Sequence, residues 1–210
     1  MIGYAITGSY CTHSRSIEAL KRLRDSGADI IPIVSENVFF TDTRFGKASE
    51  TVEKIEEICA RSCVHTITEA EKFGPAQPLD ALIIAPCTGN TLAKLASGIT
   101  DTAVTMSAKA HLRCNRPLLI ALASNDAMAA NLGNIGTLLN RKNIYFAPMH
   151  QDEPLKKLIP LLPILNVSVK HTKKCYWVYS CVLCFYKHKN RVCLTLYGIP
   201  CYFCDYYVTV

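Results

Sequence analysis

A short segment near the start of the chain, AITGSYCTHS at residues 5–14, has the composition of an anion-binding turn. An apolar stretch ends at Gly8, and Ser9, Thr12 and Ser14 follow before a helical pattern begins. Where a strand turns into a helix, free backbone N–H groups and the positive end of the helix dipole meet, which favours a phosphate. Gly8 would allow close approach, and the hydroxyls would donate hydrogen bonds. Taken alone, the segment is also compatible with an ordinary strand-to-helix turn with a serine cap.

The turn differs from a dinucleotide-binding site. Gly8 is its only glycine, whereas the dinucleotide fingerprint has three, and no acidic residue follows at the usual distance to bind a ribose. The sequence therefore favours a single phosphate over a pyrophosphate.

Three further apolar stretches, at residues 30–34, 81–85 and 117–123, are each followed by small polar residues. The carboxyl ends of parallel strands meet at one edge of a sheet, where open α/β folds bind their ligands. We therefore expect one crevice lined by side-chain amides and hydroxyls that could read the edge of a planar ring. The residues expected there are Ser35, Pro86, Asn90, Thr91 and Asn125.

The elements that must position these residues alternate between strand and helix. Strand patterns at residues 2–7, 29–35, 80–86, 117–123 and 143–149 alternate with helical patterns at residues 16–26, 47–62, 90–99, 101–114 and 125–142. This order predicts an α/β fold, a Rossmann-like open parallel sheet with helices on both faces in three layers. Ser14 or Ser16 is expected to cap the first helix, which Gly27 ends. Pro32 indicates an edge strand or an interruption of pairing.

Charge and cysteine divide the chain near residue 158. The net charge is +6 overall, but residues 158–210 carry six basic side chains and one acidic one, so the first 157 residues are close to neutral. A nearly neutral body argues against a nucleic-acid partner. No apolar run is long enough for a membrane span, and the first residues read as a strand rather than a signal, so we expect a cytoplasmic protein. The scattered cysteines of the body are expected to be reduced thiols.

The segment 158–210 is atypical, with six cysteines and seven tyrosines. Cys181 and Cys184, then Cys201 and Cys204, have the spacing of a zinc site. Their neighbours are bulky rather than turn-forming, and the change of character is abrupt. We favour an out-of-frame reading of the gene over a zinc module, so no metal is predicted, and the domains are residues 1–157 and this tail.

Four segments resemble the homo-oligomeric flavin-containing Cys decarboxylase family of flavoproteins, over roughly the first 150 residues. TGSYCTHS is similar to the phosphate loop of that family, and PCTGNT to its Pro-Ala-Ser-Ala-Asn-Thr motif. SGITDTAVT resembles the segment that packs on the flavin, with Asp101 and Thr105 in matching places. ASNDAM is similar to the Pro-Ala-Met-Asn-x-x-Met motif, matching at Asn125 and Met128.

The resemblance implies a homo-oligomer that binds FMN. The cofactor-binding residues that it implies are Gly8, Ser9, Thr12 and Ser35 at the phosphate, and Pro86, Asn90, Thr91 and Thr105 near the ring.

The decarboxylases carry a catalytic His after the second strand, whereas residues 35–47 contain none. The chain more closely resembles the B-type subunits that act with a separate NADP-binding A subunit to oxidise a dihydrodipicolinate to dipicolinate, the aromatic diacid of bacterial spores. A stand-alone FMN-dependent decarboxylase and a non-catalytic assembly subunit remain as alternatives.

A diacid substrate requires a cation, and Arg44 is the candidate, with a solvated loop charge as its alternative. The family match assigns Asn125 to the substrate. His13 is a candidate general acid or base, although it could instead cap the loop or contact the phosphate. Cys11 and Cys87 are expected to be buried, inert thiols.

Overall fold

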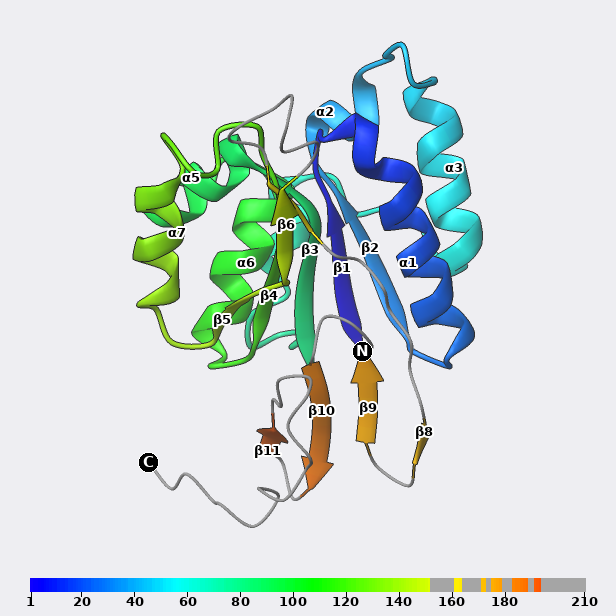
Figure 1. The fold of residues 1–210 in the computed structure, drawn as a ribbon. Helices are drawn as coiled ribbons and strands as arrows, with labels where there is room; N and C mark the ends of the chain where they lie inside the picture. Colours follow the sequence, from blue (N-terminus) through cyan, green and yellow to red (C-terminus); the bar gives the residue numbers. More distant parts are fainter. Residues whose placement is uncertain (152–160, 164–170, 173–174, 179–182, 189–190, 194–210) are drawn as a thin grey trace.

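Five parallel strands form the central sheet of the chain (Figure 1). The structure is a computed structural model that describes residues 1–151, 161–163, 171–172, 175–178, 183–188 and 191–193, with side chains as far as residue 149. The strand order is β2 (Ile30–Val34), β1 (Ile2–Ile6), β3 (Ala81–Thr88), β4 (Leu118–Ala123) and β5 (Ile144–Phe146). This order of a doubly wound sheet places the topological switch point between β1 and β3.

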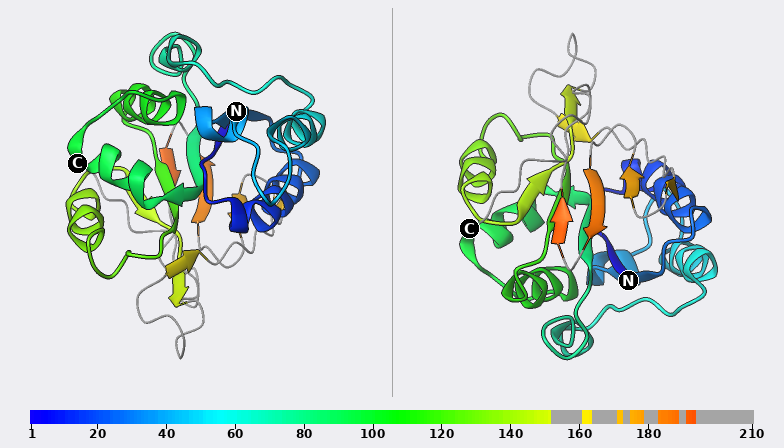
Figure 2. Two further views of the ribbon diagram at one scale, coloured as in Figure 1. Left: turned by 90° about the horizontal axis from the view of Figure 1, so that it is seen from above. Right: turned by 90° about the horizontal axis from the view of Figure 1, so that it is seen from below.

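Helices cover both faces of the sheet (Figures 1 and 2). The helices α1 (His13–Asp25) and α3 (Ala48–Cys59) pack on one face. The helices α4 (Ile67–Glu71), α5 (Gly89–Ser97), α6 (Ala103–Arg113) and α7 (Leu132–Leu139) contribute to the core on the other. Two short helices, η1 (Tyr10–Thr12) and α2 (Glu36–Phe40), follow the ends of β1 and β2.

The central strands are apolar throughout because both of their faces are buried. In β3, Leu82 and Ile84 belong to the core beneath α4–α7, whereas Ile83 and Ala85 belong to the core beneath α1 and α3. This alternation confirms the predicted three-layer α/β fold.

The first helix begins three residues earlier than its apolar pattern suggested. Its first residue is His13, so Ser14 and Ser16 lie in the first turn and cap nothing. Ser16 is fully buried, and its hydroxyl donates to the Ala85 carbonyl while lying 3.1 Å from the Tyr4 hydroxyl. Ser16, which the sequence pattern suggested as a cap, therefore forms a polar contact between α1 and the sheet.

The pattern at residues 125–142 forms a shorter helix than predicted. Only Leu132–Leu139 is helical, because the preceding residues fold into turns around Asp126. The Asp126 carboxylate accepts hydrogen bonds from the Ser124 hydroxyl and the Asn131 amide, and its carbonyl accepts from the Ala129 N–H. These local hydrogen bonds compete with the helix.

The second strand lies at the edge of the sheet, as Pro32 indicated. Its outer side is paired with a single residue of the loop before α4. Val64 donates its N–H to the Pro32 carbonyl at 3.0 Å and accepts from the Val34 N–H at 2.9 Å. The outer edge of β2 is therefore covered at this point.

Short strands follow the sheet toward the end of the chain. The strand β6 (Met149–Gln151) pairs antiparallel with β7 (Leu161–Pro163), across the predicted boundary at residue 158. The segments β8 (His171–Thr172), β9 (Cys175–Val178), β10 (Leu183–His188) and β11 (Arg191–Cys193) form an antiparallel sheet. The predicted zinc spacing depends on side chains outside the described residues. Among described helices, none combines the length and apolar character of a membrane span.

Candidate functional site

Hydrogen bonds join the carboxyl ends of β1 and β3 at the switch point. The Thr7 hydroxyl donates to the Pro86 carbonyl at 2.8 Å and accepts from the Thr88 N–H at 2.9 Å. The Thr7 N–H also donates to the Pro86 carbonyl, at 3.2 Å. Sequence reasoning missed Thr7, although a hydroxyl directly before the glycine of the turn was a visible signal. Its hydrogen bonds tie the predicted phosphate loop to the Pro86 segment.

The predicted phosphate loop is held by its own backbone. The Ser9 carbonyl accepts from both the N–H and the hydroxyl of Thr12, at 2.9 and 2.8 Å. Thr12 is buried, and its hydroxyl proton is already donated to the Ser9 carbonyl rather than being free for a ligand. The helix α1 that follows has no side-chain cap and no acidic residue in its first turn. Its N-terminal end therefore favours an anion.

Ser35 lies at the end of β2 beside this loop. Its backbone N–H donates to the Ile6 carbonyl at 3.0 Å, which ties the residue to the end of β1. Its hydroxyl oxygen is buried and has no hydrogen-bond partner among the described residues. An unpaired buried hydroxyl is costly, so this oxygen fits a site that a ligand completes.

The end of β3 lies very close to the turn that follows β4. The Thr88 hydroxyl caps α5, accepting from the Thr91 N–H at 3.2 Å and lying 3.0 Å from the Thr91 hydroxyl. Asn90 is exposed at the same turn. A Cβ on Gly89 would lie 2.6 Å from the Asn131 amide nitrogen and 2.8 Å from the Ser124 hydroxyl. Only glycine allows the ends of β3 and β4 to come this close.

The turn after β4 exposes the remaining matched residues. Asn125 is exposed, and Met128 is 53% exposed. Beside them, hydrogen bonds from Ser124 and then Asn131 lower the pKa of the Asp126 carboxyl. The strand ends of β1 to β4 thus carry Gly8, Ser9, Ser35, Pro86, Asn90 and Asn125 along one edge of the sheet, where Pro86 and the following Thr91 are buried.

Thr105 has a different environment from the one that the resemblance implied. The side chain is fully buried, and its hydroxyl forms the capping box of α6 with Thr102, at 2.9 Å from the Thr102 hydroxyl. Asp101 forms an ion pair with Lys94 at 2.8 Å. The Thr105 hydroxyl therefore stabilises the start of α6, and the Asp101 carboxylate ties the loop before α6 to α5.

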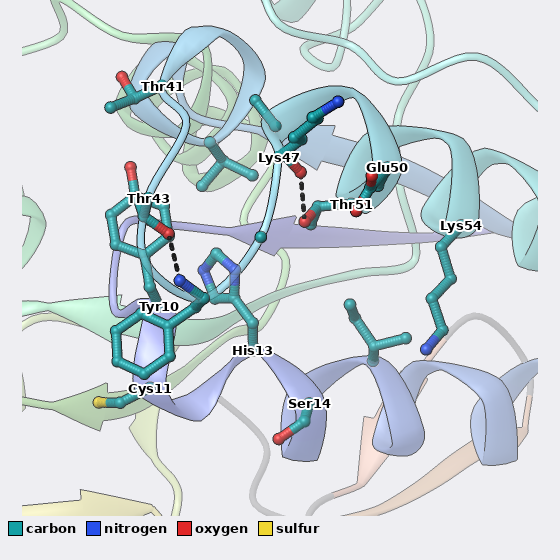
Figure 3. Close-up of a pocket in the computed structure, with 15 residues that line it drawn as sticks. Tyr10, Cys11, His13, Ser14, Thr41, Thr43, Lys47, Glu50, Thr51 and Lys54 are labelled. Carbon is teal, nitrogen blue, oxygen red and sulfur yellow. Dashed lines mark hydrogen bonds between the residues drawn. The ribbon is translucent and has the colours of Figure 1, made fainter.

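A cavity of about 320 Å³ lies beside the strand ends, between α1, α2 and α3 (Figure 3). Its lining includes Tyr10, Cys11, His13, Thr43, Lys47 and Lys54. The predicted substrate cation Arg44 is not part of the lining. Arg44 is exposed, and its guanidinium carbon lies 4.8 Å from the centre of the Phe45 ring.

His13 is nine-tenths buried in the wall of this cavity. Its Nε2 lies 2.9 Å from the Thr7 carbonyl oxygen, which can only accept, so Nε2 carries the proton. Burial lowers the pKa of the imidazole, partly opposed by this hydrogen bond. His13 is therefore neutral near pH 7 and has one remaining nitrogen, Nδ1, with a free lone pair.

The two cysteines at the strand ends differ. Cys87 is fully buried, and burial raises the pKa of its thiol far above the usual range, as expected for an inert core residue. Cys11 is exposed, contrary to the prediction, because η1 turns it outward from the sheet. The five cysteines of residues 1–149 are all unpaired.

Comparisons with known proteins agree with this geometry. Residues 1–160 match the Flavoprotein family. The chain is 44% identical to the B subunit of dipicolinate synthase from Bacillus subtilis (strain 168) over 156 residues, which are 74% of this chain and 78% of that protein. The crystal structure of the corresponding B subunit from Bacillus halodurans C superimposes with a TM-score of 0.71 and 41% identity, covering 78% of this chain and 84% of that chain.

A more distant structure shares the fold alone. The dodecameric FMN-dependent UbiX-like decarboxylase from Escherichia coli O157:H7 is 18% identical, with a TM-score of 0.55, over 70% of this chain and 80% of that chain. The chain therefore belongs to the Flavoprotein family, as its motifs predicted, and the B subunit of dipicolinate synthase is among its relatives there.

Proposed function

We propose that this chain is the B subunit of a dipicolinate synthase, which oxidises a dihydrodipicolinate together with a separate NADP-binding A subunit during spore formation. The observation that carries the proposal is the 44% identity to the Bacillus subtilis protein over 156 residues. The unpaired cysteines fit a reducing compartment such as the cytoplasm.

The strand-end edge fits FMN. The unpartnered Ser35 hydroxyl, Gly8 and Ser9 would hold its single phosphate near the N-terminus of α1. Pro86 and the exposed amides of Asn90 and Asn125 would lie along its ring. When bound, FMN supplies a ring able to accept a hydride. The chain's own contribution is to bind and orient the reactants at a rigid edge, which the Thr7 hydrogen bonds stabilise.

The proposal also includes assembly with further copies of this chain. The dodecameric relative supports an oligomer only through its shared fold. Light scattering on the purified chain measures this directly, and a monomer at micromolar concentration would contradict it.

The first test is an absorbance scan of the purified protein at the flavin bands, followed by release and identification of the cofactor. We expect bound FMN, or uptake of added FMN. The second test compares oxidation of dihydrodipicolinate by the NADP-binding partner alone and with this chain. We expect the pair to be faster, and equal rates would contradict the proposed function. A colourless chain that still stimulates its partner would indicate a subunit without flavin.

A further inference from the structure

Tyr10 joins the two segments that the proposed function assigns to the phosphate of FMN. One segment is the loop after β1, with Gly8 and Ser9, and the other is the end of β2, with Ser35. The Tyr10 hydroxyl donates a hydrogen bond of 2.9 Å to the backbone carbonyl of Asn37, which lies in α2 directly after the second segment. The resemblance of the motifs gave Tyr10 no role.

Among the described residues, this hydrogen bond alone connects the two segments. No other hydrogen bond in that part of the chain joins residues 8–12 to residues 35–41. The Ser35 N–H donates to the Ile6 carbonyl, which lies before the loop begins. The Tyr10 hydroxyl is therefore the group that ties the loop itself to the chain around Ser35.

The ring of Tyr10 is held in place by two neighbours in the same loop. A Cβ built on Gly8 would lie 3.6 Å from Cε2 of Tyr10, an ordinary contact distance, so the ring packs beside the glycine. The ring centre lies 5.1 Å from that of His13, in a tilted arrangement that aromatic rings favour. These contacts orient the hydroxyl toward the Asn37 carbonyl.

The Ser35 hydroxyl makes this connection important for an anion. Its oxygen is buried and has no partner among the described residues, so a phosphate that also contacts the loop would satisfy it. A loose loop would have to be ordered at the moment of binding, which lowers affinity. A loop that is already tied to α2 avoids that loss.

We propose that Tyr10 is a positioning residue for the phosphate group of the ligand. Its hydroxyl holds the loop after β1 at a fixed distance from Ser35, so that both segments contact the same phosphate. The inference rests on the proposed function, because it takes FMN as the ligand. Tyr10 acts through the loop and needs no contact with the flavin, so its effect is confined to flavins that carry a phosphate.

Flavin titrations on the full chain at pH 7, followed by flavin fluorescence, test this proposal. The probes are FMN and riboflavin, which differ only in the phosphate. Tyr10→Phe keeps the ring but removes the donor, so the affinity for FMN should fall about fivefold while that for riboflavin stays the same. In a Ser35→Ala background, the hydroxyl that Tyr10 positions is absent. There, Tyr10→Phe should weaken FMN binding by at most about twofold.

Tyr145→Phe is the matched control, since it removes the same group from β5, which β3 and β4 separate from β1. It should leave both affinities unchanged. The proposal is overturned if Tyr10→Phe binds FMN like the unmodified chain, if its affinity for riboflavin falls equally, or if the effects of Tyr10→Phe and Ser35→Ala are additive.

These outcomes are distinct from failure of the proposed function. An unmodified chain that binds FMN and stimulates the NADP-binding partner keeps that function, even where Tyr10→Phe has no effect and the role of Tyr10 is lost. An unmodified chain that binds neither flavin overturns the role of Tyr10 and the FMN assignment together.

Discussion

At the scale of single residues, two buried histidines link the stability of the fold to pH. His13 and His111 each place Nε2 within 2.9 Å of a backbone carbonyl, that of Thr7 and that of Pro117 respectively. Burial lowers the pKa of both imidazoles from the usual 6.5. Nδ1 of His111 is also buried without a partner in the described residues, so a proton there would be poorly solvated.

These two histidines predict that the fold loses stability at pH values higher than those at which carboxylates are protonated. Each imidazole binds a proton more readily in the unfolded chain, so the free energy of unfolding should fall as pH decreases from 7 through the unfolded pKa near 6.5 toward the lower folded value. Urea titrations at several pH values measure this. In His111→Gln, whose amide can still donate to the Pro117 carbonyl, the slope should be shallower. An unchanged slope would show that His111 does not contribute.

The hydroxyl of Thr7 predicts a second effect at this scale. Thr7→Val keeps the shape but leaves the Thr88 N–H without its acceptor, so the free energy of unfolding should decrease by about 1–3 kcal/mol. Chemical denaturation measures this, and FMN uptake should weaken as the ends of β1 and β3 loosen. The control is Thr137→Val, which removes an exposed hydroxyl bonded to the Gly133 carbonyl at 2.9 Å. It should cost less than about 0.5 kcal/mol.

At the scale of elements, the contact between the start of α5 and the turn after β4 is set by a glycine. Gly89→Ala places a methyl group against the Asn131 amide and the Ser124 hydroxyl, so the turn must move. We expect a loss of about 1–3 kcal/mol and weaker FMN uptake, measured by denaturation and by flavin absorbance. Gly136→Ala, in α7 where a Cβ meets nothing within 4 Å, should instead stabilise the chain slightly. Equal behaviour of the two variants would contradict this account of the site.

The strands and long helices were predictable because their apolar periodicity is strong. The buried run of β3 and the spacing of Val52 and Ile55 in α3 appear directly in the structure. The beginning of α1 was not predictable, because Ser16 is fixed by Ala85, which lies far away in the sequence. The turns before α7 depend on local hydrogen bonds of Asp126, which the apolar periodicity of the segment does not reveal. The resemblance of the motifs to those of the flavoprotein family located the residues at the strand ends. The cavity lined by Lys54 could not be predicted in this way, because it depends on how α1 packs against α3.

At the scale of the whole molecule, residues 1–149 contain two apolar cores, one on each face of the central sheet. The proposed boundary near residue 158 and the out-of-frame origin of the tail are tested by metal analysis and mass spectrometry of the full chain. We expect less than one zinc per chain, because bulky residues surround the Cys181 and Cys201 pairs. The described residues contain no cluster of three or more metal ligands. Stoichiometric zinc would establish the tail as a folded metal module.

The covered edge of β2 has a consequence for how copies of this chain can associate. Pro32 has no N–H to offer, and the Pro32 carbonyl and the Val34 N–H are already used by Val64. A strand of another molecule therefore finds these positions of the edge occupied, which disfavours extension of the sheet by strand pairing there. Assembly at this part of the edge is therefore expected to use helices and loops, so that mutations of surface side chains, rather than of the strand backbone, would control it.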